Sequence, residues 1–422
     1  MKISFSYPDV PPVDIPESNL LGVLEPKTLE PPKPTQDLAE DALQNPIGTP
    51  PIENAVQPTS RVLLLVDDIT RQTPAGDLLP SLLRRLSERG IPADHIKILI
   101  AAGTHALMTP QEVERKLGAQ IPKQYSVSLH HWKSAEMVEI GTTADGTPIR
   151  VNRMLREADV IVGIGQIVPH RVMGFTGGAT IVQPGVSGPE VTGYTHWAST
   201  LYAGPKILGI AENPVRHEVE RIAHLAGLQF IINVVMDSRG RVIHVVAGDI
   251  VAAHRKGAEY SRAIYGVPLP RFATIVIAES FPADYDLWQA GKGIYSSELA
   301  VRDGGVVILV TPCPHGVSDE HPEVEQLGYH GVEAVGAMLE EKRITDRVAA
   351  AHVAHVGRVI CDKARGIMVS PGIKTETQRF IGFEPAVTPQ EALQKAFAIA
   401  GTNAKVAVLR HGGDVLPLVG AT

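Results

Sequence analysis

Residues 61–68 read RVLLLVDD, an uninterrupted apolar run that ends in two acidic residues. Such a run is typical of a strand buried on both faces, as in a parallel sheet. A helical pattern follows at 77–90, DLLPSLLRRLSERG, and closes on a glycine. Strand, loop and helix recur in HIKILIAAGTH (95–105) and TPQEVERKLG (109–118). This repetition predicts a parallel sheet covered by helices, with polar loops at the carboxyl ends of its strands.

The same alternation continues along the chain. DVIVGIG (159–165) predicts another buried strand, and FIINVVMDSRGRVIHVVAGD (230–249) predicts an antiparallel hairpin. After a break rich in glycine and proline at 266–270, strands restart at ATIVIAESF (273–281) and end with AKVAVLRHG (404–412). We therefore expect an α/β fold of two domains, each a mainly parallel sheet wrapped by helices.

The break divides the expected domains into residues 1–266 and 267–422. We expect the final strand, within 404–412, to lie either in the second domain or back in the sheet of the first domain. The first 60 residues hold 12 of the 33 prolines. Because proline fixes φ and removes a backbone donor, we expect an extended amino-terminal arm with one or two short strands.

Composition narrows the functional classes. The 422-residue chain is 44% hydrophobic and 20% charged, as in ordinary globular proteins. Its net charge of −7 disfavours a nucleic-acid-binding protein, because phosphate contact needs a basic face. Cys313 and Cys361 are its two cysteines and cannot build a disulfide framework. No apolar stretch approaches the roughly 18 residues of a membrane span, so we expect a cytoplasmic protein that contacts no membrane.

Polar residues that can take part in chemistry follow the first two predicted strands. Asp68 and Arg71 belong to DDITR (67–71), where an arginine can bind a substrate carboxylate through two hydrogen bonds. An Asp–Arg ion pair that only shapes the loop is the alternative. His105 ends AAGTH (101–105), and an imidazole there can move a proton near neutral pH. A solvated or capping histidine is the alternative at that position.

A glycine-dense segment, HRVMGFTGGAT (170–180), is the richest candidate region. Its backbone N–H groups can cradle a phosphate, and the hydroxyls of Thr176 and Thr180 add polar contacts. It contains neither a Walker motif nor GxGxxG, so spacing alone does not identify a nucleotide site. His170 precedes the glycines and His196 follows them, in expected strand-end loops. Each histidine has a structural alternative, but loops of this kind converge in space, which favours a shared site.

The second half contributes WQAGKG (288–293), which follows a predicted strand and begins a helix. Lys292 can neutralise a substrate carboxylate there, and Gln289 can donate or accept a hydrogen bond. A lysine on a solvated helix face is the alternative. Cys313 has no acid–base partner at an informative spacing, and we expect it to be structural.

Seven segments, in this order, resemble the nickel-dependent lactate racemase family: DDITR, AAGTH, PHRVMGFTGGAT, TGYTHWA, FIINVV, AGD and WQAGKG. The resemblance extends from NLLGVLEP near the amino end to AVLRHGGDVLP near the carboxyl end. Members of this family racemise or epimerise 2-hydroxy acids.

The resemblance implies a cofactor and a reaction. The cofactor is a nickel-pincer nucleotide, a pyridinium-3,5-bisthiocarboxylic acid mononucleotide that holds nickel through sulfur and ring carbon. The reaction removes hydride from the substrate C2 and returns it to either face. Matching positions imply His105 and His170 as the two bases, Asp68 as their supporting acid, His196 as the nickel ligand, Arg71, Lys292 and Gln289 as substrate contacts, and Thr176, Gly177, Gly178 and Thr180 as cofactor contacts.

One segment departs from the family pattern. Its best-known members read SGGRK where this chain reads TGGAT (176–180). The lysine that joins the cofactor covalently is therefore replaced by Thr180. No lysine occurs between Lys133 and Lys206, so none can substitute after a small shift in alignment. We expect the cofactor to be held without a covalent bond.

Three functional hypotheses follow. The first is an isomerase that acts on a small 2-hydroxy acid, and the family implies cofactor-maturation proteins as its partners. The second is a carrier that binds nickel or the nucleotide without turnover. The third is a zinc-dependent hydrolase in which the three histidines hold zinc and Asp67 or Asp68 acts as general base.

Overall fold

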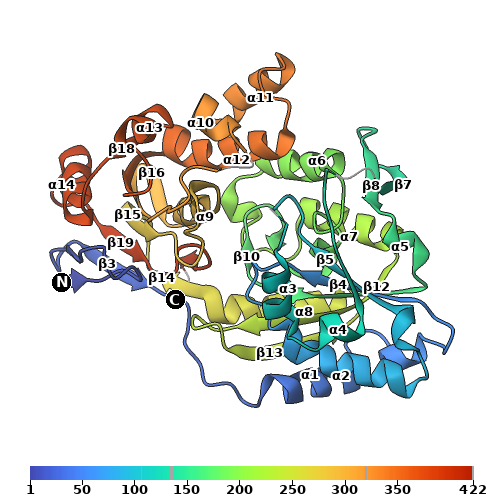
Figure 1. Cartoon of the computed structure of the whole chain (residues 1–422). Coiled ribbons are helices and arrows are strands. Elements are labelled where there is room, and N and C mark those ends of the chain that lie inside the picture. Colours follow the sequence, from blue (N-terminus) through green and yellow to red (C-terminus); the bar gives the residue numbers. More distant parts are fainter. Residues whose placement is uncertain (106, 134–135, 319–320, 421–422) are drawn as a thin grey trace.

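The computed structural model describes residues 1–105, 107–133, 136–318 and 321–420, and it contains two α/β domains (Figure 1). Each domain is built on a six-stranded sheet with helices on its faces. This confirms the predicted fold class. None of the helices within these ranges is both long and apolar enough to cross a membrane.

The first sheet has the strand order β13-β12-β9-β4-β5-β6. Its strands are parallel except β13, which forms the predicted antiparallel hairpin with β12. Every residue of β4 is buried, as its apolar sequence predicts. The strand bounds are β4 Val62–Asp67, β5 Ile96–Ala101, β6 Ser126–Leu129, β9 Val160–Gln166, β12 Leu228–Met236 and β13 Val242–Gly248.

Helices cover both faces of this sheet. One face packs against α1 and α2, and the other against α7. Helix α3 begins with a capping box between Thr109 and Glu112. The helices of this domain are α1 Thr35–Gln44, α2 Ala75–Glu88, α3 Pro110–Leu117, α4 Ile121–Gln124, α5 Met154–Glu157, α6 Pro189–Thr200, α7 Pro214–Ala226 and α8 Ala252–Tyr265. Two small hairpins, β7 Met137–Thr142 with β8 Pro148–Asn152 and β10 Pro169–His170 with β11 Gly174–Phe175, complete it.

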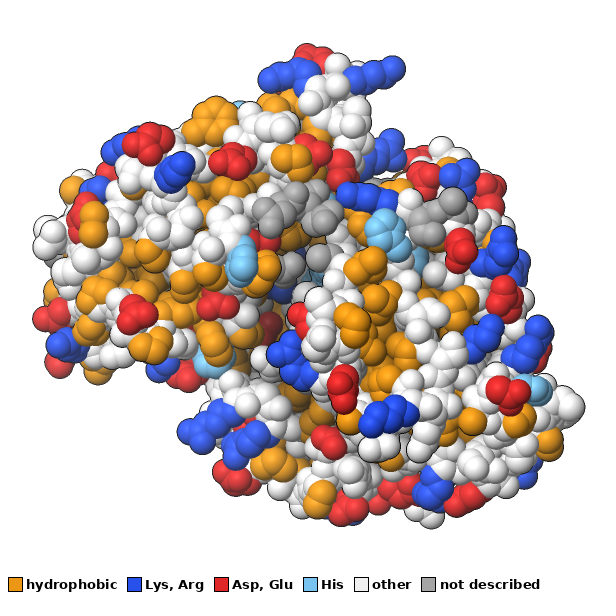
Figure 2. All heavy atoms as spheres, in the orientation of Figure 1, with side chains coloured by type: hydrophobic (Ala, Val, Ile, Leu, Met, Phe, Trp, Pro, Cys, Tyr) orange, Lys and Arg blue, Asp and Glu red, His pale blue; other side chains and the backbone are white. Residues whose placement is uncertain are grey.

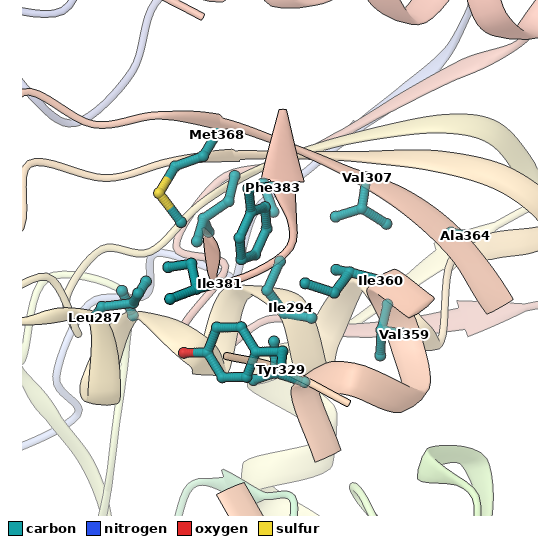
Figure 3. Packing of buried hydrophobic residues seen from close by; sticks show 14 of the residues in the cluster. Leu287, Ile294, Val307, Tyr329, Val359, Ile360, Ala364, Met368, Ile381 and Phe383 are labelled. Carbon is teal, nitrogen blue, oxygen red and sulfur yellow. The ribbon is translucent and has the colours of Figure 1, made fainter. Parts of the chain in front are cut away.

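The second sheet is parallel throughout, in the order β18-β17-β16-β15-β19-β3. Leu287 and Ile294 of helix α9 pack against Met368 and Phe383 in its core (Figure 3). The strands are β3 Leu20–Leu24, β15 Ala273–Glu279, β16 Val301–Val310, β17 Ala364–Val369, β18 Phe383–Pro385 and β19 Val406–Leu409. The helices are α9 Leu287–Glu298, α10 Glu323–Leu327, α11 Val332–Glu340, α12 Arg347–Gly357, α13 Thr375–Phe380 and α14 Pro389–Ala400.

The amino-terminal arm corrects the expected domain bounds. It is extended with short strands as predicted, β1 Lys2–Ile3 and β2 Val13–Asp14, but it belongs to the second domain. β3 pairs with β19, and the amide and hydroxyl of Ser6 each donate a 2.7 Å hydrogen bond to Glu279. The final predicted strand, β19, lies between β15 and β3, so its return to the first sheet is wrong. Through β3, the arm therefore forms the edge strand of the second sheet, beside β19.

Helices α6 and α12 lie side by side where the two domains meet (Figure 1). Small residues on α12, Ala349–Ala351 and Ala354, let the helix axes approach closely. On the facing helix, a Cβ added at Gly193 lies only 2.8 Å from the Cβ of Arg347. The contact is also polar, because Nε2 of His355 lies 2.8 Å from the hydroxyl of Ser199. The two domains are therefore in direct contact through α6 and α12.

Replacement of Gly193 by valine tests this contact. The new side chain collides with Arg347, so we expect the free energy of unfolding to fall by about 1–3 kcal/mol, as for overpacked cores. Chemical denaturation measures this change. Gly336→Ala in α11 is the matched control, because its new Cβ meets nothing closer than 3.9 Å and should leave stability equal or slightly higher. Equal stability of both variants would contradict the proposed close contact.

Candidate active site

A cleft of about 1190 Å³, counted out to its solvent opening, lies between the two domains. The molecular surface is hollowed between its two lobes (Figure 2). Loops after β4, β5 and β9 line one side, and helices α9 and α12 line the other. The cleft brings together all but one of the residues singled out in the sequence: Asp68, Arg71, His105, His170, Thr176, Gly177, Thr180, His196, Gln289 and Lys292.

Asp68 and His105 form a hydrogen-bonded pair at the ends of β4 and β5. Nδ1 of His105 lies 2.8 Å from Oδ2 of Asp68. Burial alone would raise the pKa of Asp68, but the charges of His105 and Arg71 outweigh it and lower the pKa to about 2. A carboxylate at Nδ1 favours the tautomer protonated there, which leaves Nε2 as the basic nitrogen. The pair therefore has the arrangement of a general base oriented by an acid.

His170 ends β10 and lines the same cleft. Its Nδ1 accepts a 3.3 Å hydrogen bond from the amide of Met173, which orients the ring. Burial, together with the charges of Arg71 and Lys292, holds the pKa of His170 well below its usual value. The ring is therefore neutral at pH 7, and because Nδ1 accepts from Met173, the ring proton is on Nε2, which is a hydrogen-bond donor in this tautomer.

His196 lies on helix α6, which corrects its predicted place in a loop. The glycine and threonines of this segment lower helix propensity, so tertiary packing decides the conformation. Nδ1 of His196 lies 2.8 Å from the carbonyl oxygen of Thr192 and donates its proton to it. Burial lowers the pKa of His196 to about 4, so the ring is neutral. Its Nε2 therefore carries a lone pair, as in a metal-binding histidine oriented by a backbone carbonyl.

Two cations face the cleft without a carboxylate partner. Neither Arg71 nor Lys292 has an ion pair within 4.0 Å in the part of the chain that the structure describes. Burial and the charge of Arg71 lower the pKa of Lys292 to about 8. Gln289 lies three residues before Lys292 on α9, so the two share a helix face. Together these groups can bind a small anion such as a carboxylate.

The glycine-rich loop is held by hydrogen bonds within it and to neighbouring segments. The hydroxyl of Thr176 donates to the carbonyl of Gln166, and that of Thr180 donates to the carbonyl of Gly177 at 3.0 Å. Gly177 has a φ of +75°, and an added Cβ would meet Ile167 at 2.6 Å, so only glycine fits. The two threonines and Gly177 line the cleft and give it its shape.

Gly178 is the exception among the candidate residues. Its amide donates a 2.7 Å hydrogen bond to Oδ1 of Asn233, and an added Cβ would meet His254. Gly178 is not among the described residues that line the cleft, and its contact with a cofactor stays a prediction. Asn233 itself does line the cleft.

Sequence reasoning missed a wall built by α9 and α12. Trp288 stacks on His352 with ring centroids 4.1 Å apart, and Nδ1 of His352 lies 2.8 Å from the hydroxyl of Tyr295. Since Ser199 donates its proton to the carbonyl of His196, Nε2 of His355 must donate to Ser199. Nδ1 of His355 is then an acceptor, and it has no partner among the described residues. The sequence signal that could have revealed this wall is the pair of histidines, three residues apart, in the alanine-rich segment AAAHVAHVG (349–357).

The residues of the cleft offer a nickel ligand for the cofactor that the resemblance implies, but they offer no lysine at position 180 for a covalent bond to it. Neutral His196 offers an imidazole nitrogen of the kind that nickel accepts. Lys292 is the sole lysine among the described residues that line the cleft, and it belongs to the opposite domain from Thr180. Asp67, one general base considered for a zinc hydrolase, is already paired with Lys116 at 2.7 Å.

A cleft between two α/β domains, with neutral imidazoles and unpaired cations, is typical of an enzyme that acts on a small molecule. Residues 9–205 match the family model of the lactate racemase N-terminal domain, and residues 271–416 match that of the C-terminal domain. The chain belongs to the lactate racemase family and is an isomerase of the racemase type.

Known relatives resemble the chain over most of its length. It is 28% identical to the lactate racemase of Thermoanaerobacterium thermosaccharolyticum over 96% of both chains, and 29% identical to that of Lactiplantibacillus plantarum over 90% of both. The solved lactate racemase apoprotein from T. thermosaccharolyticum aligns over 99% of this chain and all of that one, with a TM-score of 0.87 and 28% identity. A Thermotoga maritima protein, 24% identical with a TM-score of 0.74 over 93% of this chain and all of that one, shares the fold.

Proposed function

We propose that the protein racemises or epimerises a 2-hydroxy acid with the help of a bound nickel-pincer nucleotide. The observation that carries this proposal is the meeting, in one cleft, of the Asp68–His105 pair with neutral His196 and the unpaired cations Arg71 and Lys292. A racemase of 2-hydroxy acids needs each of these groups: a proton acceptor, a metal ligand and a carboxylate site.

His196 would hold the nickel through Nε2, and the loop that contains Gly177 and Thr180 would lie against the nucleotide. When bound, this cofactor supplies a centre that accepts the substrate C2 hydrogen as hydride and gives it back. Thr180 cannot form the covalent bond that a lysine forms, so the cofactor would be held by coordination and hydrogen bonds alone. Proteins that assemble and deliver this nucleotide are the partners that the proposal requires.

Arg71 and Lys292 would bind the substrate carboxylate, with Gln289 as a further hydrogen-bonding group. This arrangement presents the C2 hydroxyl to the histidines. Nε2 of His105 would take the hydroxyl proton of one enantiomer, and the charge of Asp68 would stabilise the imidazolium that results. His170 would serve the hydroxyl of the other enantiomer in the tautomer protonated at Nδ1, which requires the hydrogen bond from the Met173 amide to break. Burial lowers the pKa of His170 well below its usual value, so this ring is neutral before the proton moves.

A non-catalytic nickel or nucleotide carrier is the second candidate, favoured by the threonine at position 180. A carrier would bind the same cofactor but would not need two proton acceptors beside a carboxylate site. Turnover therefore separates the two functions.

Racemisation is the direct test. Protein produced together with the enzymes that make the nickel-pincer nucleotide is mixed with single enantiomers of aliphatic, aromatic and polyhydroxy 2-hydroxy acids, and optical rotation is followed. We expect rotation to decay toward zero for a true racemase substrate, or to a new equilibrium value for an epimerase substrate. His196→Ala should lose both nickel and activity, whereas His105→Ala should keep nickel and lose at least about 100-fold in kcat, as expected for a general base.

Nickel content measured by inductively coupled plasma mass spectrometry distinguishes the two variants. Loss of nickel from His105→Ala with retention in His196→Ala would mean that these roles are reversed. A protein that holds nickel and nucleotide yet leaves every enantiomer unchanged would be the carrier.

The pH dependence of kcat/KM tests Lys292. Its pKa lies at about 8 in the folded protein, so its charge is present below pH 8 and is lost as the pH rises through that value. We therefore expect kcat/KM to fall several-fold between pH 7.5 and 9.5, because substrate carboxylate binding weakens. Lys292→Arg keeps its charge over this range and should remove this pH dependence. A decline of equal size in that variant would exclude Lys292 as its cause.

The mode of cofactor attachment is tested by mass spectrometry. We expect denatured protein to have the mass of the polypeptide alone, because Thr180 offers no amine for a covalent bond. Under native conditions the same sample should carry the additional mass of the nucleotide and nickel. An adduct that survives denaturation would contradict non-covalent binding, and peptide mapping would then locate the attachment residue.

A further inference from the structure

A second group of potential metal ligands lies in the C-terminal domain, outside the residues that line the cleft. It consists of His321, Glu323 and Asp346, and one ligand atom from each lies within 4.8 Å of the other two. Nδ1 of His321 lies 3.6 Å from Oδ2 of Asp346, so the imidazole is directed at the carboxylate. Atoms that bind one divalent ion at about 2.0–2.2 Å lie at most about 4.4 Å apart, so small side-chain movements bring these atoms to ligand separations.

Two atoms of this group are buried without a partner. The side chain of His321 is only 3% exposed, and its Nδ1 has no hydrogen-bond partner among the described residues. Oε2 of Glu323 is likewise buried and without a hydrogen-bond partner in the described ranges. Leaving such atoms without a partner costs free energy, and a cation that accepts their lone pairs removes that cost.

The elements that carry these residues hold them in place. Asp346 is the N-cap of α12, where Oδ1 accepts hydrogen bonds from the amides of Val348 and Ala349. This division of roles leaves Oδ2 free to face His321. Glu323 is the first residue of α10, and the His321 ring stacks on Trp288 with centroids 3.8 Å apart. The ligand atoms are therefore preoriented by a helix cap and a ring stack.

We propose that His321, Glu323 and Asp346 bind a divalent transition-metal ion of the zinc or manganese type. One nitrogen and two carboxylate oxygens form a ligand set suited to these ions, with water completing the coordination. The ion joins the start of α10 to the start of α12. Because Trp288 stacks on His321 and also lines the cleft, the ion fixes a wall of the active site without touching the substrate.

The test uses a His196→Ala background, so that the proposed nickel ligand cannot contribute. Metal is removed with a chelator, and Zn²⁺ or Mn²⁺ is then titrated against the full-length chain by calorimetry, with the melting temperature as a second readout. We expect one equivalent to bind and to raise the melting temperature. Glu323→Gln and Asp346→Asn should each weaken binding at least about tenfold, and asparagine preserves the helix cap.

Glu325→Gln is the matched control, because Glu325 is an exposed residue of the same short helix and lies outside the cluster. It should bind the metal as the parent does. Equal affinity in Glu323→Gln and Glu325→Gln would overturn the proposal, as would the absence of binding of both ions by the parent at millimolar concentration. If Asp346→Asn does not fold, the comparison of the two glutamate variants still decides the question.

Discussion

Close packing of α6 on α12 is the constraint on which the site depends. Helix α6 carries His196, and α12 carries His352 and His355, so the distance between the helices sets the width of the cleft. Glycine at 193 and alanines on α12 permit this distance, and the His355–Ser199 hydrogen bond links the two helices. A buried ion pair between Arg171 and Glu298, 3.4 Å apart, adds a second link between the domains. The site is thus a property of the interface between two domains.

Burial at this interface also determines the protonation of the site. Desolvation disfavours charged imidazoles, so His170 and His196 stay neutral, and a nearby carbonyl or amide selects which nitrogen remains free. The same desolvation lowers the pKa of Lys292, but the lysine remains largely charged at pH 7. The cleft therefore combines neutral nitrogen ligands with positive charge, which suits a metal-bound cofactor and an anionic substrate together.

Sequence reasoning worked best where local rules apply. Asp68, Arg71 and His105 follow buried strands, and strands of a parallel sheet end at a common edge, so their convergence was predictable. His196 was harder, because its helix contains residues with low helix propensity and forms through contact with α12. The roles of Gly178 and His355 depend on Asn233 and Ser199, which are distant in sequence and form no local pattern.

Two parallel-sheet domains, the polar strand ends and the family were predictable from the chain's residues alone, since apolar periodicity and short motifs are local properties of the chain. Three features appear only in the folded molecule: the arm pairs with the second sheet, hydrogen bonds select the free imidazole nitrogens, and α9 and α12 form one wall of the cleft. The physical reason is that strand pairing, desolvation and hydrogen-bond direction depend on neighbours brought together from remote parts of the chain. A side chain's identity fixes what chemistry it can do, and its surroundings fix which of those states it adopts.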